Sequence, residues 1–245
     1  MMGGPRIRLR FGRRAPPAAV ISCDEDCECM QEVFSFEDDF CGRPPTTVLQ
    51  NDQWINASSG AAAITVVDIN NGWWGIKLLA DDSVAELRTT GFCFGFPLTG
   101  TLRVKTHLAG STLTPFLVGS EFRFGLTGPG VGGLFAMEFL SQDPAQWLIQ
   151  ITLASIQQTP ILTMIPVSTN CSDPDELEII ATLTLVRFLI NGVQVHSFIP
   201  PLALTAAVFD LHYRLASEAN ILPQAINTDL VCVKMPRVCR SPPIS

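Results

Sequence analysis

Runs in which apolar and polar residues alternate fill most of the chain after residue 42. In residues 102–108 every second residue is apolar or threonine, and two basic residues and a histidine occupy the positions between them. Residues 121–126 repeat the alternation, with Glu121, Arg123 and Gly125 opposite two phenylalanines and a leucine. Successive side chains of a strand point to opposite faces, so both runs predict strands with one dry and one wetter face.

The alternating runs recur at short, near-regular intervals, and almost no segment shows helical periodicity. The predicted strands are residues 62–69, 73–80, 83–89, 101–108, 120–126, 133–140, 146–154, 177–190, 193–199, 208–216 and 229–235. Glycine, proline and asparagine separate them, and Asn191-Gly192 is the strongest hairpin signal. This pattern predicts an all-β sandwich or barrel.

Charge divides the chain into three predicted parts. Residues 1–42 form an extended arm that is first arginine-rich and then acidic, residues 43–235 form the β-sandwich, and residues 236–245 form a C-terminal tail. The arm carries five arginines without an acid in residues 1–22 and eight acids without a base in residues 23–42. We expect its arginines to act as an interaction arm: Arg6, Arg8, Arg10, Arg13 and Arg14. The acidic balance of the whole chain, −7, disfavours a nucleic-acid partner, and no run is long enough to cross a membrane.

Four of the eight cysteines lie in the acidic part of the arm, at Cys23, Cys27, Cys29 and Cys41. Neighbouring carboxylates raise the pKa of a thiol, so these cysteines make poor nucleophiles. Their spacing is unusual for zinc, and we predict disulfides rather than a metal site. Cys93 and Cys232 lie in apolar strand-like runs and are expected to be buried.

Several features in sequence order resemble the concanavalin A-like lectin/glucanase jelly rolls, in the variety common in phage structural proteins. They are FEDDFCG at 36–42, Trp54, NNGWWGIKLLADDSVAEL at 70–87, LRVKTHL leading to EFRFGL at 121–126, QWLIQITL, and the long run that closes with NTDLVCVKM at 227–235. The resemblance covers about residues 36–235 and implies a two-sheet jelly-roll sandwich behind the N-terminal arm.

Catalytic patterns are missing from the sequence. The glucanases of that family carry a Glu-x-Asp-x-Glu strand, which places two carboxylates on one face, and no such run occurs here. The acidic segment at 173–178 starts beside a proline and is predicted to be a solvated loop. His107, His196 and His212 lie in different predicted strands, and we expect them to be exposed or satisfied strand histidines. The sequence therefore predicts no enzyme, no catalytic residue, no metal and no cofactor.

The resemblance and the charged arm together predict a virion structural protein, most simply a phage capsid decoration or cement protein. Its expected partners are the major capsid protein or other virion subunits, and analogy implies a homo-oligomer, a trimer. Its expected location is the virion, assembled in the host cytoplasm.

A carbohydrate-binding, lectin-like module for host attachment is the alternative. It requires exposed aromatic side chains. The first candidates are Trp73 and Trp74, and the further candidates are Trp54 and Trp147. A glycoside hydrolase with an unfamiliar carboxylate pair is a third hypothesis.

Overall fold

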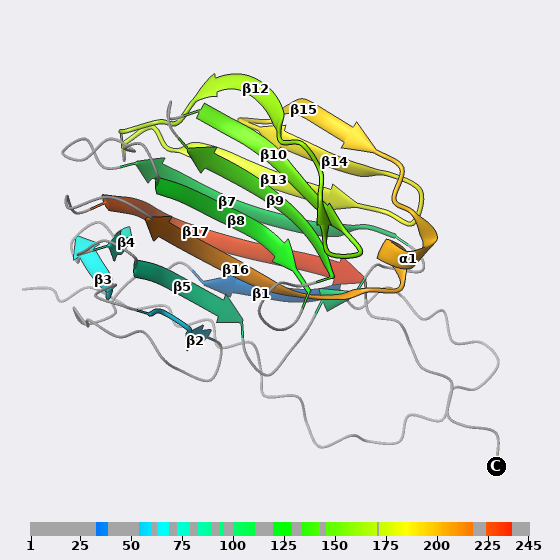
Figure 1. The fold of residues 1–245 in the computed structure, drawn as a ribbon, viewed down its shortest axis with the longest axis horizontal. Helices are drawn as coiled ribbons and strands as arrows, with labels where there is room; N and C mark the ends of the chain where they lie inside the picture. The colour runs from blue at the N-terminus through cyan, green and yellow to red at the C-terminus, as the bar shows by residue number, and fades with distance from the viewer. Residues whose placement is uncertain are drawn as a thin grey trace, which may run out of the picture.

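Two antiparallel β-sheets packed face to face make up the described part of the chain. The computed structural model describes residues 33–38, 54–59, 63–68, 73–78, 83–89, 94–95, 100–110, 120–128, 134–142, 146–170, 172–217 and 224–236. Figure 1 shows β10, β9, β8, β16 and β5 as one layer in front of a second layer that contains β13, β7 and β17. The predicted two-sheet β-sandwich is confirmed.

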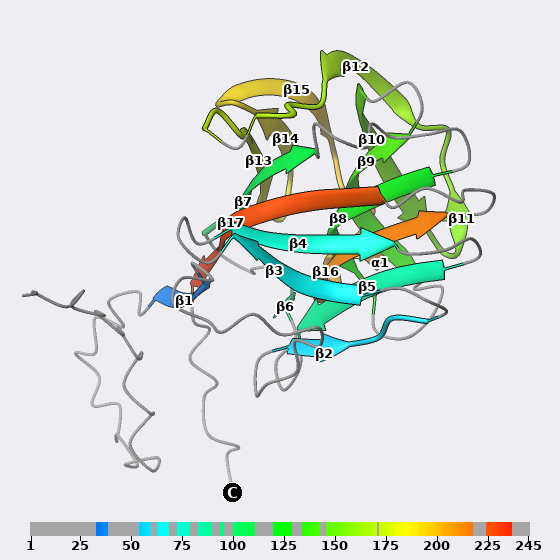
Figure 2. The ribbon, with the colours of Figure 1, turned by 90° about the vertical axis from the view of Figure 1, so that its left-hand side faces the viewer.

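The first sheet, called sheet A, has eight strands. Its order is β15 (Val193–Phe198), β14 (Val186–Ile190), β13 (Asp175–Ala181), β7 (Leu102–Gly110), β17 (Gln224–Pro236), β4 (Trp73–Leu78) and β3 (Ala63–Asp68), and β1 (Val33–Asp38) also pairs with β17. Figure 2 shows β7, β17, β4 and β3 side by side. The strand β1 lies within the range that the sequence predicts as arm, and it pairs antiparallel with the last strand of the chain.

The second sheet, called sheet B, has nine strands. Its order is β11 (Ile156–Gln157), β10 (Gln146–Leu153), β9 (Phe135–Gln142), β8 (Ser120–Thr127), β16 (Val208–Ser217), β5 (Ser83–Thr89) and β2 (Trp54–Asn56); β12 (Ile161–Pro166) also pairs with β10, and β6 (Phe94–Gly95) with β16. A single turn of helix, α1 (Leu202–Thr205), lies between β15 of sheet A and β16 of sheet B. No helix among the described residues is long and apolar enough to cross a membrane.

Alternation decides which side chains fill the space between the sheets. In β7, Leu102, Val104, Thr106 and Leu108 are fully buried, while the alternate residues Arg103, Lys105 and His107 are exposed or half-buried. In β8, Phe122 and Phe124 point into the same core. The predicted one-dry-face pattern of both strands is confirmed, and it leaves the polar residues of β8 on the outer face of sheet B.

Polar groups also connect the two sheets through the core. Thr106 Oγ1 of sheet A lies 2.7 Å from Tyr213 Oη of sheet B and 3.1 Å from Thr228 Oγ1. Trp147 Nε1 of sheet B donates a hydrogen bond of 2.7 Å to Asp175 Oδ2 of sheet A. Buried polar groups are costly unless they are paired, so these contacts fix how the sheets face each other.

Turn chemistry explains where the predicted strands were right and where they were wrong. The Asn191-Gly192 hairpin is confirmed: it joins β14 to β15, and both residues have positive φ, 52° and 75°. The predicted single strand over 177–190 is wrong, because Thr182 accepts from and donates to Leu185 and closes a loop between β13 and β14. The strand β12 was missed, since its sequence ILTMIP follows one proline and ends on another.

Candidate functional site

The outer face of sheet B carries side chains that the strand register aligns in rows. Gln150 of β10, Glu138 of β9, Gly125 of β8, His212 of β16 and Arg88 of β5 occupy successive positions of one row. Neighbouring strands in a sheet lie about 4.8 Å apart. The row therefore brings together groups from five strands that are far apart in the sequence.

Gly125 is the gap in this row that lets its two neighbours meet. A Cβ atom at this position would lie 2.3 Å from the carbonyl oxygen of Met137 and 2.8 Å from Cα of Glu138. Without a side chain on β8, His212 Nε2 reaches over the strand and lies 2.6 Å from Glu138 Oε1. Both side chains are almost completely shielded from solvent.

Charged side chains extend this contact into a continuous chain of opposite charges, here called the charged network. Its members in spatial order are Arg88, Glu86, His212, Glu138, Arg123, Glu121 and Arg214. Arg123 connects its halves, with Nη1 3.2 Å from Glu138 Oε2 and Nε 2.9 Å from Glu121 Oε1. Arg214 Nη1 donates to the same oxygen of Glu121 at 2.7 Å. Three acids thus alternate with three arginines and one histidine.

Electrostatics lower the pKa of two acids of the network, Glu86 and Glu138. Burial on its own raises the pKa of Glu138, but hydrogen bonding and charge from His212 and Arg123 outweigh it and lower that pKa below 4.5. The pKa of Glu86 is lowered in the same way by His212 and Arg88 against the effect of burial. For His212, burial lowers the pKa, and the two glutamates outweigh that effect and raise it above 6.5. The network therefore favours a protonated imidazole between two carboxylates.

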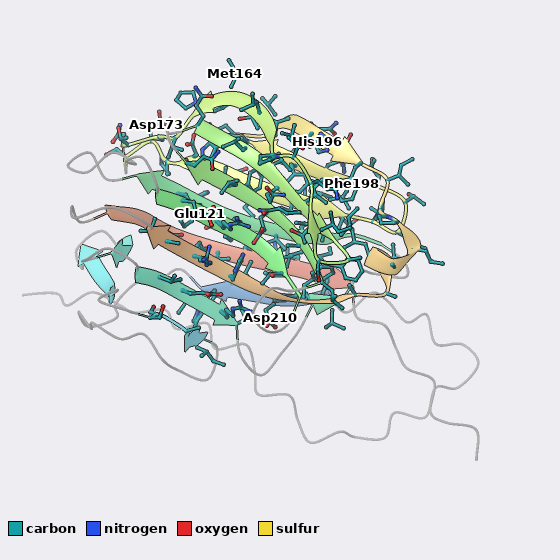
Figure 3. All side chains as sticks on the ribbon, in the orientation of Figure 1. Glu121, Met164, Asp173, His196, Phe198 and Asp210 are labelled. Atoms are coloured by element: carbon teal, nitrogen blue, oxygen red, sulfur yellow. The ribbon has the colours of Figure 1, made fainter. Side chains whose placement is uncertain are left out.

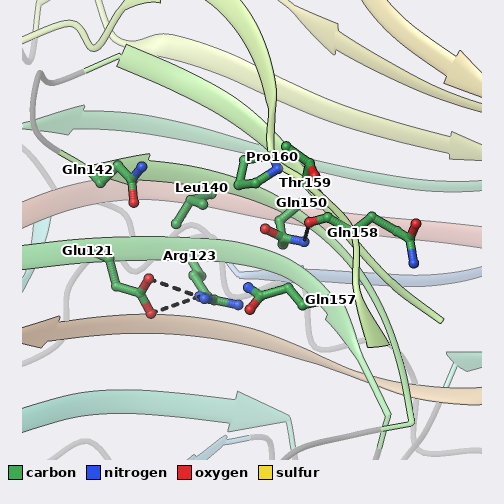
Figure 4. A pocket seen from close by; sticks show the side chains of 9 residues that line it. All are labelled: Glu121, Arg123, Leu140, Gln142, Gln150, Gln157, Gln158, Thr159 and Pro160. Carbon is green, nitrogen blue, oxygen red and sulfur yellow. Dashed lines mark hydrogen bonds and ion pairs between the residues drawn. The ribbon is translucent and has the colours of Figure 1, made fainter. Parts of the chain in front are cut away.

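A groove of about 420 Å³ opens on this face at the Glu121 end of the network. Figure 3 shows Glu121 on the same face of sheet B, away from the β12 edge marked by Met164. Figure 4 shows the residues that line the groove: Glu121, Arg123, Leu140, Gln142, Gln150, Gln157, Gln158, Thr159 and Pro160. The lining combines four glutamines, one compensated ion pair and a leucine, so the groove is polar and nearly neutral.

The segment after β10 forms one wall of the groove. A tight turn at Ala154 and Ser155, with φ of 50° and 63°, reverses the chain into β11. The backbone N–H of Gln158 then donates to the carbonyl of Ile151 at 2.9 Å and holds the returning segment against β10. Gln157, Gln158 and their neighbours are therefore held beside the outer face of sheet B.

The charges of the groove limit what it can do chemically. Glu121 is the carboxylate of the network that lines the groove, and its side chain is 28% exposed. Glu138, on the other side of Arg123, is 3% exposed. A ligand in the groove can meet amide groups, the hydroxyl group of Thr159 and the carboxylate of Glu121. No cluster of three or more metal-ligating side chains occurs in the described ranges.

The structure places few of the residues that the sequence singled out. The arm arginines Arg6, Arg8, Arg10, Arg13 and Arg14 and the cysteines Cys23, Cys27, Cys29 and Cys41 lie outside the described residues. Trp73 and Trp74 begin β4 in sheet A, and their side chains are outside the described part. The roles predicted for these residues stay predictions. Cys93 is also outside it, and Cys232 is half-buried rather than buried.

Two tryptophans considered for glycan stacking cannot serve that purpose. Trp54 and Trp147 have no exposed surface and belong to the core between the sheets. Trp147 packs edge-on against Phe122 and Phe139. The three histidines stay on separate strands, as expected. His212 is bonded through Nε2 to Glu138, which was not foreseen, while its buried Nδ1 has no hydrogen-bond partner among the described residues and lies 3.7 Å from Glu86 Oε1.

Sequence reasoning missed the charged network because it searched for two acids on one strand. Here Glu86, Glu121 and Glu138 come from β5, β8 and β9. The usable signal was alternation: in SVAELRT, EFRFGL and FDLHYRL the charged residues fall on every second position. Strand order, which single-strand alternation does not give, brings them together.

Sequence comparison leaves the family of this chain open. No family model matches it. A curated relative, ribosomal protein uS12 methylthiotransferase RimO of Acidothermus cellulolyticus, is 31% identical over 147 residues. The match covers 58% of this chain and 29% of the methylthiotransferase, so the chain spans less than a third of that protein's length.

Comparison with solved structures matches this chain to β-sandwich glucanases. An endo-1,3-β-glucanase from Streptomyces sioyaensis superposes with a TM-score of 0.61 and 15% identity over 81% of this chain and 94% of that one. The catalytic domain of an endo-1,3-β-glucanase (laminarinase) from Thermotoga petrophila gives 0.57 and 13% over 85% and 100%. The chain has the concanavalin A-like jelly-roll fold. A β-1,3-1,4-glucanase (lichenase) from a mouse hindgut metagenome shares this jelly roll, with a TM-score of 0.58 and 12% identity over 81% and 98%.

This comparison corrects the predicted function. The jelly rolls that match this chain are glucanases and other glycan-acting proteins, which contradicts the prediction of a virion decoration or cement protein. It also contradicts the prediction that the chain is not an enzyme. A Glu-x-Asp-x-Glu strand places its carboxylates along one strand, whereas this jelly roll brings Glu86, Glu121 and Glu138 together from three strands.

Proposed function

We propose that this chain is a carbohydrate-active enzyme that holds a segment of a neutral polysaccharide in the groove on the outer face of sheet B. The observation that carries the proposal is the position of the groove beside the charged network, with the Glu121 carboxylate in its lining. The concanavalin A-like fold, which the chain shares with the glucanases, also supports a carbohydrate-active function.

The lining of the groove suits a polyhydroxylated, uncharged chain. Amides of four glutamines offer both donors and acceptors, which sugar hydroxyl groups need. Pro160, which is half-buried, supplies apolar surface for the C–H face of a sugar ring. Arg123 is compensated by Glu121 and Glu138, so the groove has no uncompensated cation that would select an acidic polysaccharide.

Glu121 is the group proposed to act on the bound chain. Two arginines hold it, Arg123 through both carboxylate oxygens at 2.9 and 3.1 Å and Arg214 at 2.7 Å. A carboxylate in this position can serve as the nucleophile or general base of glycoside hydrolysis, and because no second carboxylate is among the described lining residues, the leaving oxygen takes its proton from water. Glu138 is not suited to the proton-donating role, because its pKa is lowered and it is buried.

Affinity electrophoresis and release of reducing ends test the proposal together. The panel contains a β-1,3-glucan, a β-1,3-1,4-glucan and a β-1,4-xylan as neutral chains, with polygalacturonate as the acidic comparison. We expect retardation by a neutral chain, cleavage of that chain, and no retardation by polygalacturonate. Absence of both retardation and cleavage with every neutral chain would overturn the proposal.

The substitution Glu121→Gln separates catalysis from binding. It keeps the shape and the hydrogen-bonding oxygen but removes the charge, so we expect cleavage to fall by about 100-fold or more while retardation persists. Glu176→Gln is the matched control, because Glu176 is also a strand glutamate in an ion pair, 2.5 Å from Lys105 on sheet A. Equal cleavage by Glu121→Gln and the wild type would remove Glu121 from the mechanism.

A further inference from the structure

Gln150 is a buried groove residue with an unused hydrogen-bond acceptor. It belongs to β10, has no exposed surface, and lines the groove. Its Oε1 atom has no hydrogen-bond partner among the described residues. Buried polar atoms are rarely left in this state, so an unpaired acceptor in a groove wall indicates a position that a ligand group can complete.

The orientation of this amide is fixed by its nitrogen. Gln150 Nε2 donates to two backbone carbonyls, that of Ile151 at 3.1 Å and that of Gln158 at 2.8 Å. Figure 4 shows the contact between Gln150 and Gln158 across the groove wall. Turning the amide over would place its oxygen against two acceptors, so Oε1 stays the unpaired atom.

An acceptor that cannot turn into a donor selects its ligand chemically. It binds an O–H or N–H group and rejects a group that carries acceptors alone, such as a carboxylate. Glu138 occupies the neighbouring position on β9, and its negative charge also disfavours an anion here. Pro160 also lines the groove and provides apolar contact for the carbon atoms beside a hydroxyl group.

We infer that Gln150 is a specificity-determining residue whose Oε1 accepts a hydrogen bond from one hydroxyl group of the sugar unit bound in the groove. The inference rests on the proposed function and deepens it, because it selects a glycan with a free hydroxyl group at that point. An O-methylated or fluorinated unit lacks the donor and binds there more weakly.

Titration calorimetry with defined oligosaccharides tests the inference. The probes are a β-1,3-linked and a β-1,4-linked glucose hexasaccharide, each also made with one hydroxyl group at a time replaced by fluorine. We expect one fluorinated position to weaken binding to the wild type about tenfold, the effect of one lost hydrogen bond of roughly 1.4 kcal/mol.

The variant Gln150→Met shows whether Gln150 causes the weaker binding of the fluorinated oligosaccharide. Methionine keeps the volume but removes both the acceptor and the two hydrogen bonds that Nε2 donates to Ile151 and Gln158. The decisive result is therefore the fluorination step: we expect about tenfold weaker binding and no further loss on fluorination at the sensitive position. Gln194→Met on β15 is the matched control, because Gln194 is exposed on sheet A, and it should behave as wild type.

The outcomes separate the two claims. If the wild type binds and the same fluorinated position weakens Gln150→Met by the same factor, Gln150 does not recognise that hydroxyl group and the inference falls alone. Unchanged binding by Gln150→Met has the same meaning. If neither hexasaccharide nor any neutral chain of the panel binds the wild type, the proposed function falls and the inference falls with it.

Discussion

His212 and Glu138 form a hydrogen bond of 2.6 Å across a strand that belongs to neither of them. His212 lies on β16 and Glu138 on β9, and β8 runs between these strands. The two side chains can reach each other because Gly125 of β8 places no side chain at the point where they cross the strand. A single glycine thus lets the group Arg88, Glu86 and His212 join the group Glu138, Arg123, Glu121 and Arg214 in one network on the face that carries the groove.

The first prediction concerns pH and stability. The pKa of His212 is raised in the folded protein, so its contribution is present below its ordinary value of 6.5 and is lost as pH rises through the raised folded pKa. The pKa values of Glu86 and Glu138 are lowered, so their contribution is present above 4.5 and is lost as pH falls through the lowered folded values. We expect the free energy of unfolding, measured with urea, to be largest between these limits.

The variant His212→Gln tests whether His212 causes the loss of stability at alkaline pH. It removes the cation that Glu86 and Glu138 share and leaves each with one arginine, so we expect destabilisation by about 3 kcal/mol near neutral pH and a flatter decline at alkaline pH. His107→Gln changes a half-exposed strand histidine of β7 and should keep the wild-type decline. A wild-type slope in His212→Gln would show that the histidine does not carry the pH dependence.

The second prediction tests the gap at Gly125. Gly125→Ala would place Cβ 2.3 Å from a backbone carbonyl oxygen, so β8 and β9 must move apart. We expect destabilisation by about 3 kcal/mol and a weaker His212–Glu138 contact, seen as a smaller pH dependence of unfolding. Gly95→Ala is the control, because a Cβ there meets nothing within 4 Å, and it should unfold like the wild type.

The sandwich could be predicted from the sequence because its information is local. Alternation in 102–108 and 121–126 marks the inner faces of β7 and β8, and the Asn191-Gly192 turn sets the β14–β15 register. Strand ends depend on individual hydrogen bonds that alternation does not reveal. The loop closed by Thr182 and Leu185, for example, lies inside an apolar run that looks like one continuous strand in the sequence.

The candidate site could not be predicted because its information is not local. Glu138 and His212 are 74 residues apart, and their contact depends on strand order. Gln150 offers no signal in the sequence, since a glutamine on the wet face of a strand looks like any solvated residue. Its burial comes from the returning segment at Gln158, whose carbonyl accepts from it.

The third prediction concerns the polar contact between the sheets. Tyr213→Phe removes the hydroxyl group that lies 2.7 Å from Thr106 Oγ1, while Thr106 keeps its 3.1 Å contact with Thr228. We expect a loss of about 1 kcal/mol in the free energy of unfolding. The ring contacts with Trp54 and Phe124 do not involve the hydroxyl group, so the near-ultraviolet circular dichroism should stay close to wild type. A variant as stable as the wild type would show that this hydrogen bond adds nothing to the packing.

The last prediction separates backbone strain from side-chain bonding at Asn191. Its φ of 52° lies in the left-handed region, Oδ1 accepts from the backbone N–H of Glu176 at 2.8 Å, and Nδ2 donates to Asp175 Oδ1 at 3.1 Å. Asn191→Ala loses both bonds and keeps a Cβ in the strained conformation, whereas Asn191→Gly loses the bonds and relieves the strain. We expect losses of about 2–3 kcal/mol for alanine and about 1 kcal/mol less for glycine, measured by urea unfolding. Because Asp175 also accepts from Trp147, the tryptophan fluorescence of both variants should report the same disturbance. Equal stability of the two variants would mean that the turn stores no strain and that the bonds to Asp175 and Glu176 account for the whole effect.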